Sequence, residues 1–114
     1  MILELVEFRS PPGWSRARVL EDAKHTVARW RANGELVRKH FLLSADGKTG
    51  AGVYLWPSTE AAQRAHNEVW RQSVIKRTGA APTSRYFDLL LLVDNEKGTV
   101  TEWLDDGAAR PVPV

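Results

Sequence analysis

Residues 36–56 read LVRKHFLLSADGKTGAGVYLW, and this stretch carries the local pattern that decides the fold. Two segments rich in apolar and aromatic residues, 36–44 and 50–56, flank a short polar segment. Asp46-Gly47 within it supplies the positive-φ positions that a tight hairpin requires. We therefore predict two antiparallel strands over 36–44 and 50–56, joined by a turn at 45–48.

Two further strands are predicted outside this hairpin. Residues 2–9 and 84–94 are rich in apolar and β-branched types. With one helix before the hairpin and one after it, the order is βαββαβ, which is the ferredoxin-like α+β arrangement. We expect a single domain over 1–104, with an antiparallel four-stranded sheet and two helices on one face. Residues 99–104 are a candidate short fifth strand, and 105–114 are expected to be an irregular tail.

The two helices are predicted from capping residues and apolar periodicity. Ser15 is a suitable N-cap for a helix over 16–32, and Ser58 or Thr59 for a helix over 59–78. At about 100° per residue, each helix has one apolar side. These sides are Val19, Leu20, Ala23, Val27 and Trp30 in the first helix, and Ala61, Ala62, Ala65 and Val69 in the second.

Both faces of the predicted sheet are apolar. The last strand contains Leu89–Val93 without a polar residue, and the third strand, from Val53 to Trp56, is apolar on both sides as well. Helices on one face would leave the other face as a patch that monomers rarely expose. We expect a homodimer that packs sheet against sheet, centred on Leu89–Val93. The alternative is that the C-terminal segment folds back over this face.

The composition argues against several classes of function. The formal net charge is +2, from 16 basic and 14 acidic residues that are interspersed, whereas nucleic-acid-binding domains usually carry a one-sided basic patch. The absence of cysteine excludes a thiol nucleophile and thiolate metal sites. The N-terminus lacks the basic region of a signal peptide, and no apolar run is long enough to span a bilayer. We expect a cytoplasmic protein that binds neither nucleic acid nor membrane.

The second helix carries the clearest candidate site. His66 and Trp70 are four residues apart, so they are neighbours on one helix face, and small alanines beside them leave room for a pocket. His66 is a candidate general base, because histidine titrates near neutral pH. The alternative is a half-buried histidine bonded to a backbone carbonyl. The aromatic residues expected to line the pocket with Trp70 are Trp30, Tyr54, Trp56 and Tyr86.

Lys39 and His40 are adjacent in a predicted strand, so their side chains point to opposite faces. One of them must enter apolar surroundings or cross a dimer interface, and both are therefore candidate functional residues.

Common nucleotide and metal motifs are absent. Gly47-Lys48-Thr49 ends like a phosphate-binding loop, but the glycine required five positions before Gly47 is Leu42. No G-x-G-x-x-G occurs, and three scattered histidines without cysteine do not predict a metal site. We expect no metal and no cofactor.

Four segments resemble the YdhR-type monooxygenase family of the dimeric α+β barrel superfamily. They are Gly34-Glu35-Leu36-Val37-Arg38-Lys39, Gly52-Val53-Tyr54-Leu55-Trp56, Ser58-Thr59-Glu60-Ala61-Ala62 and Tyr86-Phe87-Asp88. The resemblance spans about residues 2–94. It implies a homodimer with facing sheets and a pocket between sheet and helices in each subunit.

The resemblance also implies a cofactor-independent monooxygenase of small aromatic or polyketide-like substrates. In that chemistry a base removes an acidic proton, and the resulting anion reduces molecular oxygen in a dry pocket. On this sequence His66 would be the base, and Lys39 or Tyr86 the group that stabilises the anion. These roles rest on the expected pocket, because the superfamily shares no universal catalytic residue. Trp30, Tyr54 and Trp70 would form the walls.

Two other functions fit the same scaffold, because a fold does not fix a function. An isomerase or cyclase would need the base but not oxygen. A non-catalytic binding or stress-response dimer would need only an apolar pocket. Haem ligation by His66 or His40 is a minor alternative.

Overall fold

The computed structural model describes residues 1–113 and contains two antiparallel sheets and four short helices. Among the described residues, no helix is both long and apolar enough to cross a membrane. In chain order the elements are β1 (Ile2–Arg9), α1 (Arg16–Lys24), α2 (Val27–Ala32), β2 (Arg38–Leu43), β3 (Thr49–Trp56), α3 (Thr59–Ala65), α4 (Glu68–Thr78), β4 (Thr83–Asp88), β5 (Leu91–Asp94), β6 (Thr99–Trp103) and β7 (Ala109–Pro111).

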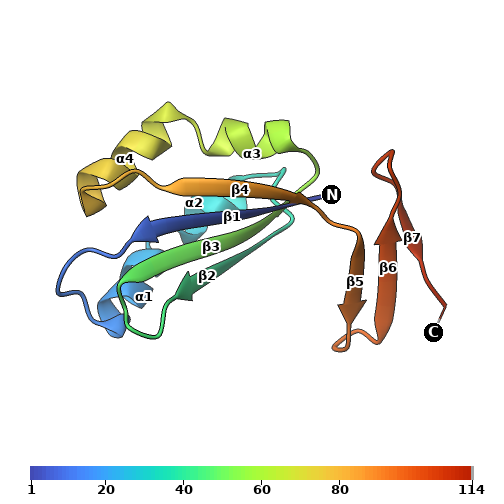
Figure 1. Cartoon of the computed structure of the whole chain (residues 1–114), viewed down its shortest axis with the longest axis horizontal. Helices are drawn as coiled ribbons and strands as arrows, with labels where there is room; N and C mark the ends of the chain where they lie inside the picture. Colours follow the sequence, from blue (N-terminus) through green and yellow to red (C-terminus); the bar gives the residue numbers. More distant parts are fainter. Residues whose placement is uncertain (114) are drawn as a thin grey trace.

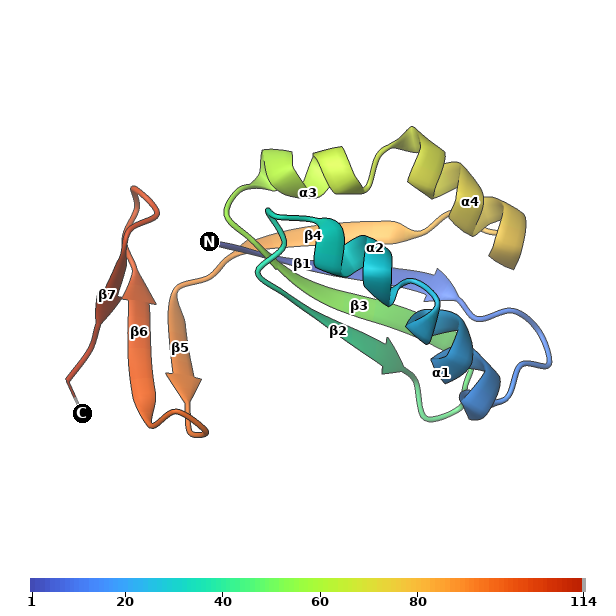
Figure 2. The ribbon, with the colours of Figure 1, turned by 180° about the vertical axis from the view of Figure 1, so that it is seen from behind.

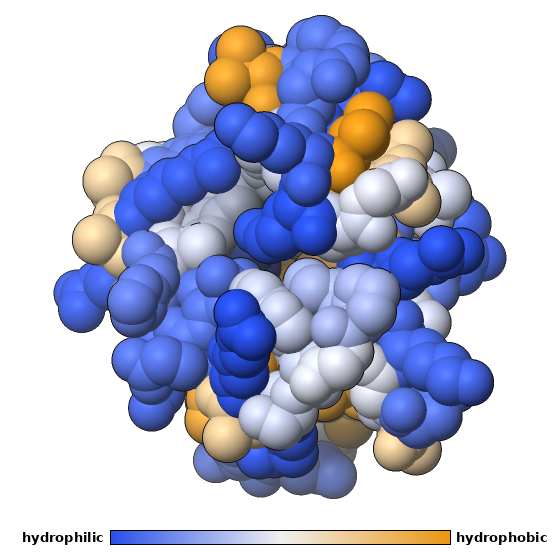
Figure 3. Space-filling view, turned by 90° about the vertical axis from the view of Figure 1, so that its left-hand side faces the viewer, coloured by the Kyte–Doolittle hydropathy of each residue, from blue (hydrophilic) through white to orange (hydrophobic). Residues whose placement is uncertain are grey.

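The main sheet has the strand order β2-β3-β1-β4, and every neighbouring pair is antiparallel. Figures 1 and 2 show α1 to α4 along one side of this sheet. This confirms the predicted α+β ferredoxin-like fold and the predicted 36–56 hairpin. The end formed by the β1–α1 loop, the β2–β3 turn and the end of α4 is mainly hydrophilic, with hydrophobic residues in small separate groups (Figure 3).

Each predicted helix is divided in two. The first is interrupted at His25 and Thr26, and the second at His66 and Asn67. The Asn67 side chain accepts a hydrogen bond from the Trp70 backbone N–H at 3.0 Å, so it caps a new helix.

The interruption changes which side of the second helix faces the sheet. The expectation that Val69 lies on the core side is wrong, because Val69 is 80% exposed. Val74 is only 1% exposed and packs inward in its place. A new helix start resets the apolar phase, which a single uninterrupted periodicity does not anticipate.

The predicted last strand, 84–94, is also divided. The main sheet ends with β4 at Asp88, which pairs with Ile2, and the last backbone bond runs from Leu89 N–H to the Met1 carbonyl at 3.0 Å. The chain then turns away into a second, three-stranded sheet of β5, β6 and β7, which projects from the main body (Figure 1). The expected interface centre, Leu89–Val93, therefore does not lie in the main sheet.

The C-terminal region is more regular than expected. β6 confirms the candidate strand at 99–104, and β7 forms within the stretch 105–114 that was expected to be irregular. β7 pairs with β6 in the register Glu102 opposite Arg110, and these two side chains form an ion pair. Backbone pairing and this ion pair give the tail its structure.

Strand register assigns the polar residues of the main sheet to its two faces. Glu4 is opposite Tyr54 on one side and Tyr86 on the other, and Lys39 is opposite Tyr54. Residues in direct register share a face, so all four side chains point toward the helices. His40 points to the face that no helix covers. Of the adjacent pair Lys39 and His40, it is therefore Lys39 whose side chain enters apolar surroundings.

Candidate functional site

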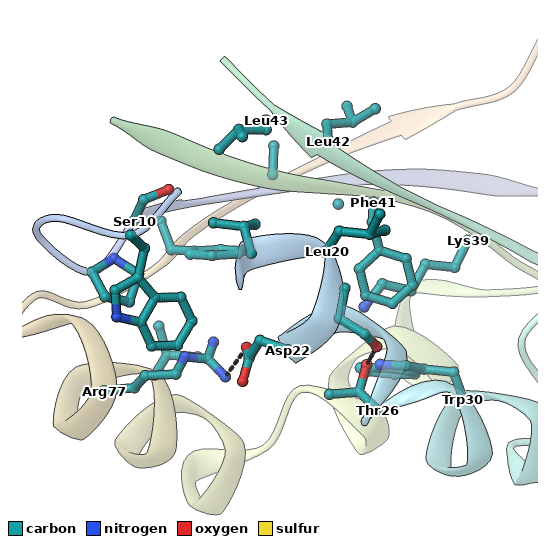
Figure 4. Close-up of a pocket in the computed structure, with 18 of the residues that line it drawn as sticks. Ser10, Leu20, Asp22, Thr26, Trp30, Lys39, Phe41, Leu42, Leu43 and Arg77 are labelled. Atoms are coloured by element: carbon teal, nitrogen blue, oxygen red, sulfur yellow. Dashed lines mark hydrogen bonds and ion pairs between the residues drawn. The ribbon is translucent and has the colours of Figure 1, made fainter. Parts of the chain in front are cut away.

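A cavity of about 260 Å³ lies between the sheet and the helices α1, α2 and α4 (Figure 4). Its lining includes four of the predicted site residues, Trp30, Lys39, Tyr54 and Trp70. The apolar part of the wall is formed by Phe8, Val19, Leu20, Ala23, Phe41 and Val74. Polar groups at the wall include Ser10, Asp22, Thr26, Arg29 and Arg77.

Lys39 reaches from β2 between Phe41 and Trp30 (Figure 4). Its Nζ lies 3.9 Å from the ring centroid of Phe41, 4.0 Å from that of Trp30 and 4.5 Å from that of Tyr54. Burial lowers the pKa of Lys39 to about 7; the positive charges of Arg29 and Arg77 act in the same direction, and Glu4 opposes them. The cavity therefore contains an amine that exchanges its proton near neutral pH.

Tyr54 forms the floor of the cavity beside Lys39. The residue is 3% exposed, and its ring lies over Gly52, where a Cβ atom would come within 2.7 Å of the ring. Glycine at this position is thus required for the ring to lie flat along the strand. Burial, followed by the negative charge of Glu4, raises the pKa of Tyr54, so its hydroxyl stays protonated and can donate a hydrogen bond.

Trp30 and Trp70 form aromatic walls from α2 and α4. The Trp30 ring meets Tyr54 edge to face, with centroids 5.4 Å apart. Arg29 lies over the outer side of Trp30, and its guanidinium donates to the Ala65 carbonyl at 3.4 Å. These contacts join α2 to α3 and hold the Trp30 ring in place.

An ion pair links the two helices that flank the cavity. Arg77 of α4 lies 3.8 Å from the carboxylate of Asp22 in α1, as the dashed line in Figure 4 marks. Asp22 is the one acidic residue among those described that line the cavity. Since Arg77 already partners it, the charge balance at the wall is basic.

His66 occupies a different place from the one expected. Its Nδ1 lies 2.8 Å from Oε1 of Glu4, and the same oxygen accepts a hydrogen bond from Trp56 Nε1 at 2.9 Å. The His66 ring packs behind Tyr54 and Trp70, with centroids 4.6 and 4.2 Å away. Because it is the C-cap of α3, its side chain turns toward Glu4 in β1 and not along a continuous helix face.

None of His66, Trp56 and Tyr86 lines the cavity, in contrast to the expectation that all three would. Trp56 is fully buried in the core. Tyr86 lies opposite Glu4 on β4, where burial, followed by the charge of Glu4, raises its pKa. Of the three residues predicted to act on a substrate, the structure brings only Lys39 to the cavity.

Glu4 was not among the predicted site residues. The period of β1 places it on the same face as Val6 and Phe8, and an acid on the core-facing side of a strand is the signal that identifies it. His66 Nε2 and Glu4 Oε2 have no hydrogen-bond partner among the described residues. Within residues 1–113, no group of three or more His, Asp and Glu side chains is placed to hold a metal ion.

Comparisons with known proteins give a likeness of fold. No protein-family profile and no curated protein matches the chain. A monooxygenase from the gene ActVA-Orf6 of Streptomyces coelicolor, solved with the ligand nanaomycin D, is 16% identical with a TM-score of 0.62, and the match covers 82% of this chain and 90% of that one. Rv0793 from Mycobacterium tuberculosis is 14% identical with a TM-score of 0.59, covering 82% and 96%.

A structure described as an antibiotic biosynthesis monooxygenase is 14% identical with a TM-score of 0.60, covering 79% of this chain and 99% of its own. The matched share of this chain is close to the share that precedes β5. The main sheet and its helices thus have the α+β ferredoxin-like fold of antibiotic biosynthesis monooxygenase structures.

Proposed function

We propose that this protein is a cofactor-independent monooxygenase that oxidises a small hydroxyaromatic substrate in the cavity between sheet and helices. The observation that carries the proposal is the Lys39 amine at the wall of an aromatic cavity, with a pKa of about 7. The likeness of fold to two monooxygenase structures supports it. The YdhR-type resemblance of residues 34–39, 52–56, 58–62 and 86–88 belongs to the same proposal.

The first step is proton transfer. The neutral Lys39 amine takes the proton of an acidic hydroxyl or activated C–H of the substrate, which leaves a delocalised carbanion-enolate beside a new ammonium group. Lys39 then acts twice: the neutral amine is the base, and the ammonium that it becomes stabilises the anion. Its pKa near the working pH suits both halves of this transfer.

The second step uses molecular oxygen as the oxidant. The anion donates electrons to oxygen, a C–O bond forms, and the Lys39 ammonium returns its proton to give a hydroperoxide. Loss of water from the hydroperoxide breaks the O–O bond and leaves a carbonyl, so one oxygen atom enters the product and the other becomes water. Trp30, Tyr54 and Trp70 provide the flat, apolar surroundings in which an unhydrated anion is reactive.

The proposal is tested by oxygen consumption with an anthrone or dihydroxynaphthalene and no added metal or flavin. We expect turnover in the wild type and loss of about 10²–10⁴-fold in Lys39→Met, which keeps the apolar stem but lacks the amine. Lys48→Met, at an exposed turn, is the matched control. Isotope-labelled oxygen should place one labelled atom in the product, and product formation without oxygen would favour the isomerase or cyclase instead.

We further propose that the chain forms a homodimer through the face that no helix covers. This face presents Leu3, Leu5, Leu42, Val53, Leu55 and Phe87. In the isolated chain Phe87 is 49% exposed, which supports a covering partner. Light scattering after size exclusion should give twice the chain mass, and Leu55→Arg should give monomers while Val69→Arg on exposed α4 should not. A monomeric wild type at micromolar concentration would contradict the dimer.

A further inference from the structure

We propose that Lys39 is also a carbonyl-capturing residue, which binds aromatic aldehydes covalently as an imine in the cavity. This goes beyond the oxygen chemistry above and does not depend on it. It assigns to the cavity a second class of ligand, which has an aldehyde group attached to a flat aromatic ring.

The surroundings of the Lys39 amine are unusual for a lysine. Three aromatic rings, those of Trp30, Phe41 and Tyr54, lie within 4.5 Å of Nζ, measured to their centroids. No side-chain hydrogen bond or ion pair to the amine occurs among the described residues. An amine bound to a carboxylate would be held as ammonium, which is not nucleophilic, whereas Lys39 has no such partner.

The charges near Lys39 also favour the neutral amine. Arg29 and Arg77 lower its pKa in addition to burial. Neither nearby acid forms an ion pair with Lys39: Asp22 pairs with Arg77, and Oε1 of Glu4 is bonded to His66 and Trp56. The faces of the three aromatic rings attract the ammonium form and so favour a higher pKa. The pH dependence of labelling measures the resulting pKa of Lys39.

The cavity provides space for the ligand. Its volume of about 260 Å³ suits a one- or two-ring aldehyde whose ring packs on Leu20, Ala23 and Val74. With the carbonyl carbon at Lys39 Nζ, the ring faces the apolar wall. Tyr54 lines the same cavity and keeps its proton, so its hydroxyl can donate a hydrogen bond to the departing oxygen.

The reaction is a condensation without an external oxidant or reductant. The amine lone pair attacks the carbonyl carbon to give a carbinolamine. The C–O bond then breaks, and its oxygen, hydrogen-bonded to Tyr54, takes the proton that the nitrogen gives up and leaves as water. The product is R–CH=N–Lys39, formed from the aldehyde and the amine with loss of one water.

The other lysines serve as internal controls. Lys24, Lys48, Lys76 and Lys97 are all exposed. At neutral pH an ordinary lysine with a pKa of about 10.4 has roughly a thousandfold less neutral amine than one that titrates near 7. The N-terminal amine, with an ordinary pKa of about 8, is the strongest competitor.

The test is reductive trapping of the intact protein with 2-naphthaldehyde and cyanoborohydride at neutral pH, followed by peptide mass mapping. We expect one adduct per chain, located at Lys39 and recognised by loss of tryptic cleavage after that residue. Labelling should rise with pH with a midpoint near 7, and Tyr54→Phe should slow it. Lys39→Met should leave only slow labelling of the N-terminus and the exposed lysines.

Two results would overturn the proposal. One is an adduct distribution in which Lys39 is labelled no faster than Lys48. The other is a Lys39 labelling midpoint above about pH 9, the behaviour of an ordinary lysine. Neither measurement uses oxygen or turnover. Labelling of Lys39 no faster than Lys48, with a midpoint still near 7, overturns imine formation alone, whereas a midpoint above about pH 9 would also remove the base of the monooxygenase proposal. Normal labelling without turnover would overturn the monooxygenase alone.

Discussion

His66 Nδ1 lies 2.8 Å from Glu4 Oε1, and the two side chains are 2% and 0% exposed. This pair joins the end of α3 to the central strand β1, across 62 residues of sequence. A buried carboxylate without a partner is costly, and His66 meets Glu4 from the C-cap position of α3, at the break between the two helices. His66 cannot point along the α3 face and reach Glu4 at the same time.

The Glu4–His66 pair is predicted to dominate local stability. Glu4→Ala removes the acceptor for both His66 and Trp56, and we expect it to lower the free energy of unfolding by about 3–5 kcal/mol. The matched control is Glu7→Ala, which breaks only an exposed 3.3 Å pair with Arg85 and should cost less than about 1 kcal/mol. Urea unfolding followed by tryptophan fluorescence measures both, and equal losses would contradict the prediction.

The roles of His66 and Lys39 are separable by turnover. Because His66 lies behind Tyr54 and Trp70, we expect His66→Gln to reduce oxidation of a hydroxyaromatic substrate by less than about tenfold, against 10²–10⁴-fold for Lys39→Met. The assay is oxygen uptake, with circular dichroism as the check on folding. If His66→Gln instead lost more turnover than Lys39→Met, His66 would be the base, and Trp70 would have to move to expose it.

Lys39 should make stability depend on pH. An unfolded lysine keeps its proton up to about pH 10.4, whereas folded Lys39 releases it near 7. Between these values the unfolded chain binds more protons, so the contribution of Lys39 to stability rises with pH. Because one pKa unit corresponds to about 1.4 kcal/mol, we expect Lys39→Met to be more stable than the wild type by about 4 kcal/mol at neutral pH, with the difference shrinking toward pH 10. Urea titrations across this range test it, with Lys48→Met as the control, and parallel wild-type and Lys39→Met curves would refute it.

Truncation of two valines tests which side of α4 faces the sheet. Val74→Ala removes a buried side chain and should cost about 1–3 kcal/mol. Val69→Ala, five residues earlier and 80% exposed, should change stability by less than about 0.5 kcal/mol. Thermal or urea unfolding distinguishes the two variants. A larger loss of stability in Val69→Ala than in Val74→Ala would favour a single uninterrupted helix.

Gly52 is predicted to control the shape of the cavity. In Gly52→Ala the new Cβ would lie 2.7 Å from the Tyr54 ring, so the ring must move into the cavity. We expect a loss of about 1–3 kcal/mol in stability and weaker binding of aromatic ligands. Gly34→Ala, where nothing lies within 4 Å of the added Cβ, is the control. Unchanged ligand affinity in Gly52→Ala would show that Tyr54 does not shape the site.

Local sequence determined the order of the elements, because the signals are local. The Asp46-Gly47 turn, the Ser15 and Ser58 caps and the apolar composition of β1 and β3 each act within a few residues. The aromatic walls Trp30 and Tyr54 were predictable for the same reason, since helix and strand periods place them on the inner side. Trp70 lies beyond the break between α3 and α4, so its position depends on the new helix start at Asn67.

Tertiary structure decided where the last strand ends and which residue reaches the cavity. The run after Asp88 is apolar throughout, so its sequence contains no stop signal. β4 ends at Asp88, where its register with Ile2 of β1 ends, and the chain then turns away into the second sheet. Likewise, Lys39 and His40 are indistinguishable until register with Tyr54 puts Lys39 under the helices. His66 left the predicted site because its partner, Glu4, is close only in the folded chain.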